Sequence, residues 1–191
     1  MRAGYPDFRL GNVLATSFTA TLTERCGDAV ERIPTPGRLT DWMAVSGLAV
    51  DSCSTAQWEL ARELRESIHL AATAAATQNA LPASAVQVLN DRSTGGRAAA
   101  ILTPEGERRW RLGSASRVED ALGVIAADAI EIIAGERDGR LALCASPTCQ
   151  AAFFDTSQSR TRKWCDMNTC GNRQKKARYN ANQRKRSVSA D

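Results

Sequence analysis

Two pairs of cysteines near the C-terminus decide how this chain is organised. They lie in segment 144–170, which reads CASPTCQAAFFDTSQSRTRKWCDMNTC. Cys144 and Cys149 form the first pair, and Cys165 and Cys170 form the second, with 15 residues between the pairs. Zn²⁺ takes four thiolates tetrahedrally, and two short pairs supply them with little loop-closure entropy. The spacing therefore predicts one structural Zn²⁺ with a closed coordination sphere and no open position for water.

The residues around the two pairs predict a small zinc module with a treble-clef-like arrangement. Residues 151–154 and 161–164 flank the polar stretch 155–159, which is typical of a strand, a turn and a second strand. A polar, proline-free run after Gly171 predicts a helix whose start carries the last ligands. The alternatives to a zinc site are four reduced cysteines that are buried independently, or a redox-active set.

Charge divides the chain into two parts. Residues 1–143 carry 15 arginines and 18 acidic residues, whereas residues 144–191 carry ten basic and three acidic residues. All four lysines of the 191-residue chain lie in the second part. The C-terminal quarter is therefore a separate, strongly basic unit. The remaining cysteines, Cys26 and Cys53, have no partner spacing and are expected to be ordinary thiols.

The part of the chain before the zinc module predicts a mostly helical domain with a few strands. Residues 10–22 are rich in Thr, Val, Phe and Leu with loose alternation, which predicts a strand. Residues 97–112 predict a hairpin, because turn residues separate two short β-prone runs. Capping residues followed by apolar periodicity predict four helices, at about 35–47, 55–77, 84–90 and 116–135.

These elements together predict the α+β class and three segments. The mostly helical N-terminal domain occupies 1–138 and is a candidate sensor or dimerisation unit. The treble-clef-like zinc module, with four cysteine ligands and a basic helix, occupies 139–186 and is joined to the first domain at 139–143. The last residues, 187–191, are expected to be a disordered tail.

The cysteine segment resembles the CGNR zinc-finger proteins, which are bacterial transcription regulators with an N-terminal ABATE domain. The resemblance rests on three motifs, Phe153–Ser157, Arg162–Cys165 and Cys170–Arg173, followed by the basic run Lys175–Arg178. It implies zinc on the four cysteines of the two pairs and a DNA-binding role for the finger.

The N-terminal part is similar to the ABATE domain through fewer residues. Leu10-Gly11 with the stretch after it, the helix with Leu39 and Trp42, and the long helix with 62–65 carry the similarity. One departure concerns the family's opening strand. An Asp and an Asn are expected after it, where this chain has Ser17 and Ala20.

The basic C-terminal segment predicts a nucleic-acid interface. Segment 160–186 contains ten basic residues and one acidic residue, Asp166. Arginine and lysine would contact phosphates, while Asn180 or a neighbouring polar residue would reach base edges of duplex DNA. The DNA-binding candidates are Arg160, Arg162, Lys163, Arg173, Lys175, Lys176, Arg178, Asn180 and Arg184. The alternatives are a solvated charged tail, RNA binding with stacked aromatic residues, or a docking surface for a protein.

No catalytic residue is predicted. The chain has one histidine, and it lacks a Gly-rich phosphate loop and a Ser-centred nucleophile elbow. The acidic residues of the long helix alternate with arginines at helical spacing, which is typical of a solvated helix face. A ligand pocket of Trp42, Trp58, Arg65 and His69 is a further hypothesis, and an enzyme that acts on a small molecule is the less favoured alternative.

Location and partners follow from the same features. The sequence has no apolar run near the 18–20 residues that cross a bilayer, and its start lacks a secretory pattern. A cytoplasmic, nucleoid-associated protein without a membrane partner is therefore expected. A single DNA-binding module buries only about 600–1,000 Å², so a homodimer or extra contacts are expected. Double-stranded DNA is the main predicted partner, and a small-molecule effector is the second.

Overall fold

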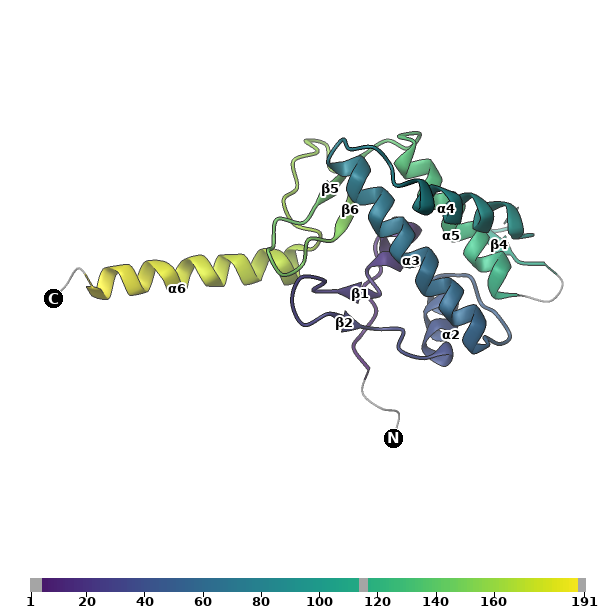
Figure 1. Cartoon of the computed structure of the whole chain (residues 1–191), viewed down its shortest axis with the longest axis horizontal. Helices are drawn as coiled ribbons and strands as arrows, with labels where there is room; N and C mark the ends of the chain where they lie inside the picture. The colour runs from purple at the N-terminus through teal and green to yellow at the C-terminus, as the bar shows by residue number, and fades with distance from the viewer. Residues whose placement is uncertain (1–4, 114–116, 189–191) are drawn as a thin grey trace.

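The computed structural model describes residues 5–113 and 117–188. Its elements are α1 (Leu14–Thr19), β1 (Leu22–Thr23), β2 (Val30–Glu31), α2 (Pro36–Val45), α3 (Thr55–Ala76), α4 (Ala83–Gly95), β3 (Ala99–Leu102), β4 (Arg108–Arg111), α5 (Val118–Ile133), β5 (Arg140–Leu143), β6 (Ala152–Asp155), the π-helical turn η1 (Met167–Gly171) and α6 (Asn172–Val188). Elements α1 to α5 form a helical body, and α6 projects from it as a single long helix (Figure 1). The predicted α+β class, mostly helical with a few strands, is confirmed.

Helix α3 is the central element of the helical body. The Ser54 hydroxyl accepts the backbone N–H of Gln57, and the Gln57 side chain accepts that of Ser54, so the predicted capping box is present. Leu64 and Ile68 lie on the buried face of α3 and are fully buried. Helices α4 and α5 pack against this face, so that the apolar periodicity of the sequence becomes the main core.

Helix α2 also contributes buried residues to the core. Thr35 caps it by accepting the backbone N–H of Arg38 at 3.2 Å, as the Thr35-Pro36 pair predicts. Trp42 is fully buried, and its ring lies 5.0 Å from the ring of Phe18 in α1. The core therefore joins segments that lie far apart in the sequence.

The strands form three two-stranded antiparallel sheets within the described residues. Strand β3 pairs with β4 as the predicted hairpin, and β5 pairs with β6 so that Leu141 faces Phe154 and Ala142 faces Phe153. Neighbouring side chains of a strand point to opposite faces. Phe154 accordingly belongs to the main core, while Phe153 packs in a second core around the cysteines.

The predicted strand at 10–22 is wrong, because residues 14–19 form helix α1. The Ser17 hydroxyl accepts the N–H of Gly11 and donates to the carbonyl of Val13, which holds the first turn. The N–H of Ala15 donates to the Asp128 carboxylate of α5 at 2.7 Å. A carboxylate 113 residues away thus supplies the cap, and it outweighs the β-propensity of the local sequence.

Two further predictions differ from the structure. Helix α4 begins at Ala83, with no side-chain cap from Ser84, and continues through the predicted turn as far as Gly95. Gly96 lies close to Gly123 of α5, since a Cβ on Gly123 would be 3.0 Å from the Gly96 Cα. This tertiary contact stabilises the longer helix against the local preference of residues 91–96 for a turn. Residues 161–164 form no strand, because the partner of β6 is β5, in the segment expected as a junction.

Two expected features lie wholly or partly outside the described residues. The cap expected at Ser116 lies outside the described residues, and α5 begins at Val118. The expected disordered tail overlaps α6, which ends at Val188, while residues 189–191 lie outside the described part of the chain.

Candidate metal centre and nucleic-acid interface

The sulfur atoms of the four paired cysteines converge on one point. The Sγ atoms of Cys144, Cys149, Cys165 and Cys170 all lie within 4.8 Å of one another. Cys165 Sγ lies 3.7 Å from both Cys149 Sγ and Cys170 Sγ. A regular tetrahedron with Zn–S bonds of about 2.3 Å has edges of about 3.8 Å. The four cysteines therefore fit one structural zinc ion, as their spacing predicts.

Each ligand comes from a different local structure. Cys144 follows β5, and its N–H donates to the carbonyl of Ala151, while Cys149 donates its N–H to the carbonyl of Ser146 and closes a tight turn. Cys165 lies in the loop before η1, and Cys170 lies within η1. The turn and the π-helical turn together bring two chain segments to one centre.

Burial and charge favour a bound divalent cation. Cys144, Cys149 and Cys170 are at most 3% exposed, whereas Cys165 is half-buried. Hydrogen bonds from Cys149 and Cys165 lower the pKa of the Cys144 thiol, and the thiols that donate these bonds have raised pKa values. Crowded thiols cannot all ionise alone, so metal binding displaces their protons.

Two residues of the resemblance motifs shape the loop that carries Cys165. The buried Asp155 carboxylate accepts the backbone N–H groups of Ser157 and Arg162, at 3.0 and 2.9 Å. Arg162 in turn donates to the carbonyl of Cys165 at 2.9 Å. A Cβ on Gly171 would lie 2.9 Å from Met167 Sδ, so a larger residue there would require the flexible Met167 side chain to shift.

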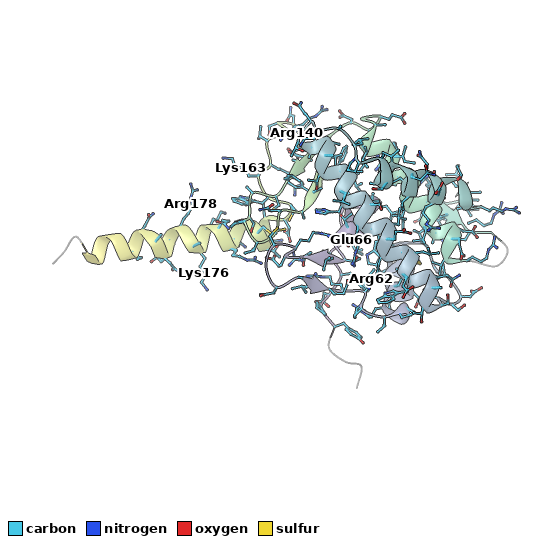
Figure 2. The ribbon with its side chains drawn as sticks, in the orientation of Figure 1. Arg62, Glu66, Arg140, Lys163, Lys176 and Arg178 are labelled. Atoms are coloured by element: carbon cyan, nitrogen blue, oxygen red, sulfur yellow. The ribbon has the colours of Figure 1, made fainter. Side chains whose placement is uncertain are left out.

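Helix α6 begins at the zinc centre and extends into solvent. Its first residue follows η1 directly, and every residue from Lys175 to Gln183 is exposed. Figure 2 shows Lys176 and Arg178 projecting into solvent on opposite sides of the helix. Asn180 is exposed beside them, and Tyr179 is 63% exposed. Arg184 belongs to α6, but its side chain lies outside the described part of the structure.

Arg173 has an intramolecular partner that the sequence did not indicate. Its guanidinium binds both carboxylate oxygens of Glu24, which lies in the helical body after β1, and the Oε1 contact measures 3.0 Å. Thr148 also donates to Glu24, at 2.7 Å. The hydrogen bonds from Arg173 hold the pKa of Glu24 below its usual value. No local pattern marks Glu24, because 149 residues separate the two partners.

The other predicted DNA-binding residues lie on the loop between β6 and η1. Arg160 forms an ion pair with Asp138, and Arg162 makes the bond to Cys165 described above. Lys163 is exposed near the start of α6 (Figure 2), and its carbonyl accepts the N–H of Ala145. The loop thus carries one exposed lysine, Lys163, for which no ion pair is found within the described residues.

The structure does not bring Trp42, Trp58, Arg65 and His69 together around a cavity. Trp42 and Arg65 are at most 1% exposed, and Arg65 binds both carboxylate oxygens of Glu31 at 2.8 and 2.9 Å. Trp58 donates its indole N–H to the carbonyl of Ile33. Burial lowers the pKa of His69 to about 4. These side chains pack the body or hold it together.

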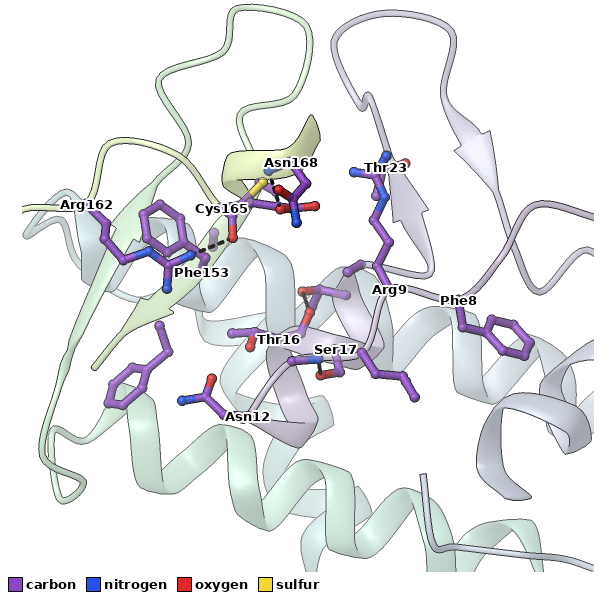
Figure 3. Close-up of a pocket in the computed structure, with 18 residues that line it drawn as sticks. Phe8, Arg9, Asn12, Thr16, Ser17, Thr23, Phe153, Arg162, Cys165 and Asn168 are labelled. Carbon is purple, nitrogen blue, oxygen red and sulfur yellow. Dashed lines mark hydrogen bonds between the residues drawn. The ribbon is translucent and has the colours of Figure 1, made fainter. Parts of the chain in front are cut away.

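A cavity of about 510 Å³ lies elsewhere, between the body and the zinc module. Figure 3 shows Thr16 and Ser17 of α1 on one side, and Phe153, Arg162 and Cys165 across from them. Arg9 contributes a half-buried guanidinium that donates weakly to Thr169 at 3.4 Å. Both departures from the ABATE pattern, at positions 17 and 20, line this cavity. Sequence reasoning missed the cavity, because its walls come from two ends of the chain.

The fold and the site define a class of protein. An α+β body with a closed four-cysteine metal centre and a projecting basic helix is a zinc-finger protein. The chain belongs to the ABATE family, described as "Putative stress-induced transcription regulator", which matches residues 12–136. The CGNR zinc finger matches residues 140–183. Both matches confirm the family that the sequence resembles.

No curated protein matches the chain. Every helix in the described part is too short or too polar to cross a membrane.

Proposed function

We propose that the chain is a DNA-binding transcription regulator whose contact element is α6. The observation that carries this proposal is the helix itself: it is 17 residues long, strongly basic, and free of tertiary packing from Lys175 to Gln183. A helix that buries no apolar face gains nothing from folding against the body. Its rigid attachment at the metal centre supports a role in contacting an anionic partner.

The positions of the exposed side chains support binding in the major groove. Lys175, Lys176 and Arg178 extend to more than one side of the helix, as phosphates do along both walls of a groove about 12 Å wide. Asn180 is the candidate for a base contact, because its amide can pair with adenine. Arg173 acts differently, since its bond to Glu24 makes it a positioning residue for the start of the helix.

Fluorescence anisotropy with the full zinc-loaded chain tests the proposal. The double variant Lys176→Ala/Arg178→Ala is titrated into duplex DNA over a salt series beside the unchanged protein. Each lost phosphate contact lowers the slope of log Kd against log salt by about 0.9, so the double variant is expected to lose about 1.8. The control is Arg109→Ala/Arg111→Ala, which removes the same charge from exposed positions on β4.

The outcomes separate the candidate functions. Duplex binding that weakens with salt and falls only in the α6 variant supports the regulator. Equal losses in both variants would mean nonspecific attraction by net charge. Tight binding to single-stranded RNA with weak duplex binding would favour an RNA adaptor, and the exposed Tyr179 ring is the feature that would stack on bases. No binding to either nucleic acid would favour a protein-docking module.

The remaining partners are part of the same proposal. One module buries little DNA surface, so we expect two copies on the operator, which sedimentation of the DNA complex measures. A small-molecule effector would bind at the cavity between body and zinc module, which has the size of a ligand site.

The protein would act in the cytoplasm, at the nucleoid. We expect no enzymatic activity, because the sequence shows no nucleophile or acid–base constellation, and four thiolates leave no position for substrate at the metal.

A further inference from the structure

One zinc ligand differs from the other three in its access to solvent. Cys144, Cys149 and Cys170 are at most 3% exposed, whereas Cys165 is half-buried. Cys165 alone among the four lines the cavity between the body and the zinc module. Figure 3 shows its side chain at the wall, beside Arg162 and Asn168. A small reagent that enters the cavity therefore meets one metal ligand.

The position of Cys165 is fixed by bonds that do not involve the metal. Arg162 donates to the Cys165 carbonyl at 2.9 Å, and Asp155 holds the N–H of Arg162. Two other sulfur atoms lie near it, because Cys149 Sγ and Cys170 Sγ are each 3.7 Å away. A disulfide bond of about 2.05 Å therefore requires a movement of about 1.7 Å from either neighbour.

We propose that Cys165 is an oxidation site through which peroxides open the zinc centre. The Cys165 thiolate attacks a peroxide oxygen: an S–O bond forms, the O–O bond breaks and hydroxide leaves, which gives a sulfenic acid. The thiolate of Cys149 or Cys170 then attacks the Cys165 sulfur, so that a disulfide forms and a second hydroxide leaves. Two thiolates lose two electrons, and one peroxide gains them.

The consequence for the fold follows from the size of the zinc module's own core. Its buried residues are few: Ala142, Cys144, Cys149, Phe153 and Cys170. A disulfide leaves two thiolates, which are too few for a closed centre that needs four. Metal loss removes most of what holds η1 and the start of α6. The effect on DNA affinity rests on the proposed function, whereas the order of oxidation does not.

The test uses the full zinc-loaded chain with Cys26→Ser and Cys53→Ser, which removes the thiols outside the cluster. Hydrogen peroxide is added, zinc release is followed with a chromogenic chelator, and free thiols are alkylated for mass spectrometry. At about one fifth of full zinc release, we expect Cys165 in a disulfide with Cys149 or Cys170, and an oxidised fraction of Cys165 about fivefold that of Cys144. Simultaneous loss of all four thiols, a first Cys144–Cys149 disulfide, or zinc retention would each overturn the proposal.

A wall variant gives an independent readout. Ala20 lines the cavity, and Ala20→Leu narrows it, so zinc release by peroxide is expected to slow about threefold. Ala56→Leu, at an exposed position of α3, is the control and leaves the rate unchanged. If Ala20→Leu does not fold, the mass-spectrometric order still decides.

A duplex-binding assay separates this proposal from the proposed function. Ordered oxidation without any duplex binding would overturn the regulator alone. Duplex binding with unordered oxidation would overturn this inference alone.

Discussion

The helical body and the zinc module are stabilised by different physical means. The body buries large apolar side chains from five helices, such as Leu64, Ile68, Leu122 and Ile125. The zinc module's own core has five buried residues, three of them metal ligands. Apolar burial contributes about 25 cal/mol per Å², so a core this small cannot offset chain entropy. The core of the helical body is therefore stable without a metal ion, whereas the core of the zinc module depends on metal binding.

Zinc removal should have the largest effect, because the zinc module and the helical body should respond to it differently. Structural zinc sites have apparent binding free energies of about 10–16 kcal/mol, so chelation or Cys170→Ser should unfold the zinc module and the start of α6. The body should keep its helices. Hydrogen exchange measures both parts in one experiment, with Cys53→Ser as the control. Unchanged protection of 167–174, which cover η1 and the start of α6, after zinc loss would contradict the prediction.

The two neighbouring phenylalanines of β6 belong to different cores. Phe154→Ala leaves a cavity in the main core and should lower the free energy of unfolding by about 3–5 kcal/mol. Phe153→Ala should instead speed zinc release, because Phe153 packs beside the cysteines. Denaturant unfolding and chelator kinetics are the two measurements. Equal effects of both variants on both measurements would mean that the cores act as one.

A buried ion pair contributes to the stability of the helical body. Arg65 is 1% exposed and binds Glu31 from β2 as well as Glu66. Arg65→Met leaves Glu31 without its partner and should destabilise the body by about 3 kcal/mol in urea unfolding. The control Arg62→Met, at an exposed position of α3, should cost less than about 1 kcal/mol. Zinc affinity should be the same in both variants, and a large change in it would contradict the separation.

The contact between Glu24 and Arg173 connects the two parts and has the smallest expected effect. Glu24→Gln removes the charge and should cost about 1 kcal/mol, because Arg173 is partly exposed. The pKa of folded Glu24 lies below its usual value of 4.5. The contact is therefore at full strength above about pH 4.5 and is lost as the pH falls through the folded value. Hydrogen exchange at the start of α6 from pH 6 to about pH 3.5, expressed as protection relative to the intrinsic exchange rate, measures the contact. The extra protection of the unchanged protein over Glu24→Gln is expected to disappear at the acid end.

Local signals predicted the parts of the fold that local chemistry controls. The capping box of Ser54 and Gln57 marked the start of α3, and the cysteine spacing marked the metal centre. Both depend on residues a few positions apart. The zinc ligands were thus predictable to the residue.

Long-range contacts decided the parts that sequence reasoning missed. Helix α1 has its cap from Asp128, which local composition cannot indicate. Arg65 was expected at a ligand pocket to which two helices contribute, and the fold shows that it also binds Glu31 of β2. Arg173 was expected to contact DNA, which stays a prediction, and the fold adds its bond to Glu24. Charged residues choose partners across space, so their roles emerged only with the fold.

Helix α6 is a rod that is attached to the rest of the protein at one end only, so a small rotation at that end moves the other end far. Its 17 residues span about 25 Å, and it is clamped at one end by η1 and the Glu24 contact. A tilt of about 10° at the clamp would displace the far end by about 4 Å, more than the 3.4 Å rise per base pair. Under the proposed function, the register of the tip on a duplex would therefore be set at its root, where the cavity of about 510 Å³, the metal centre and the helical body meet.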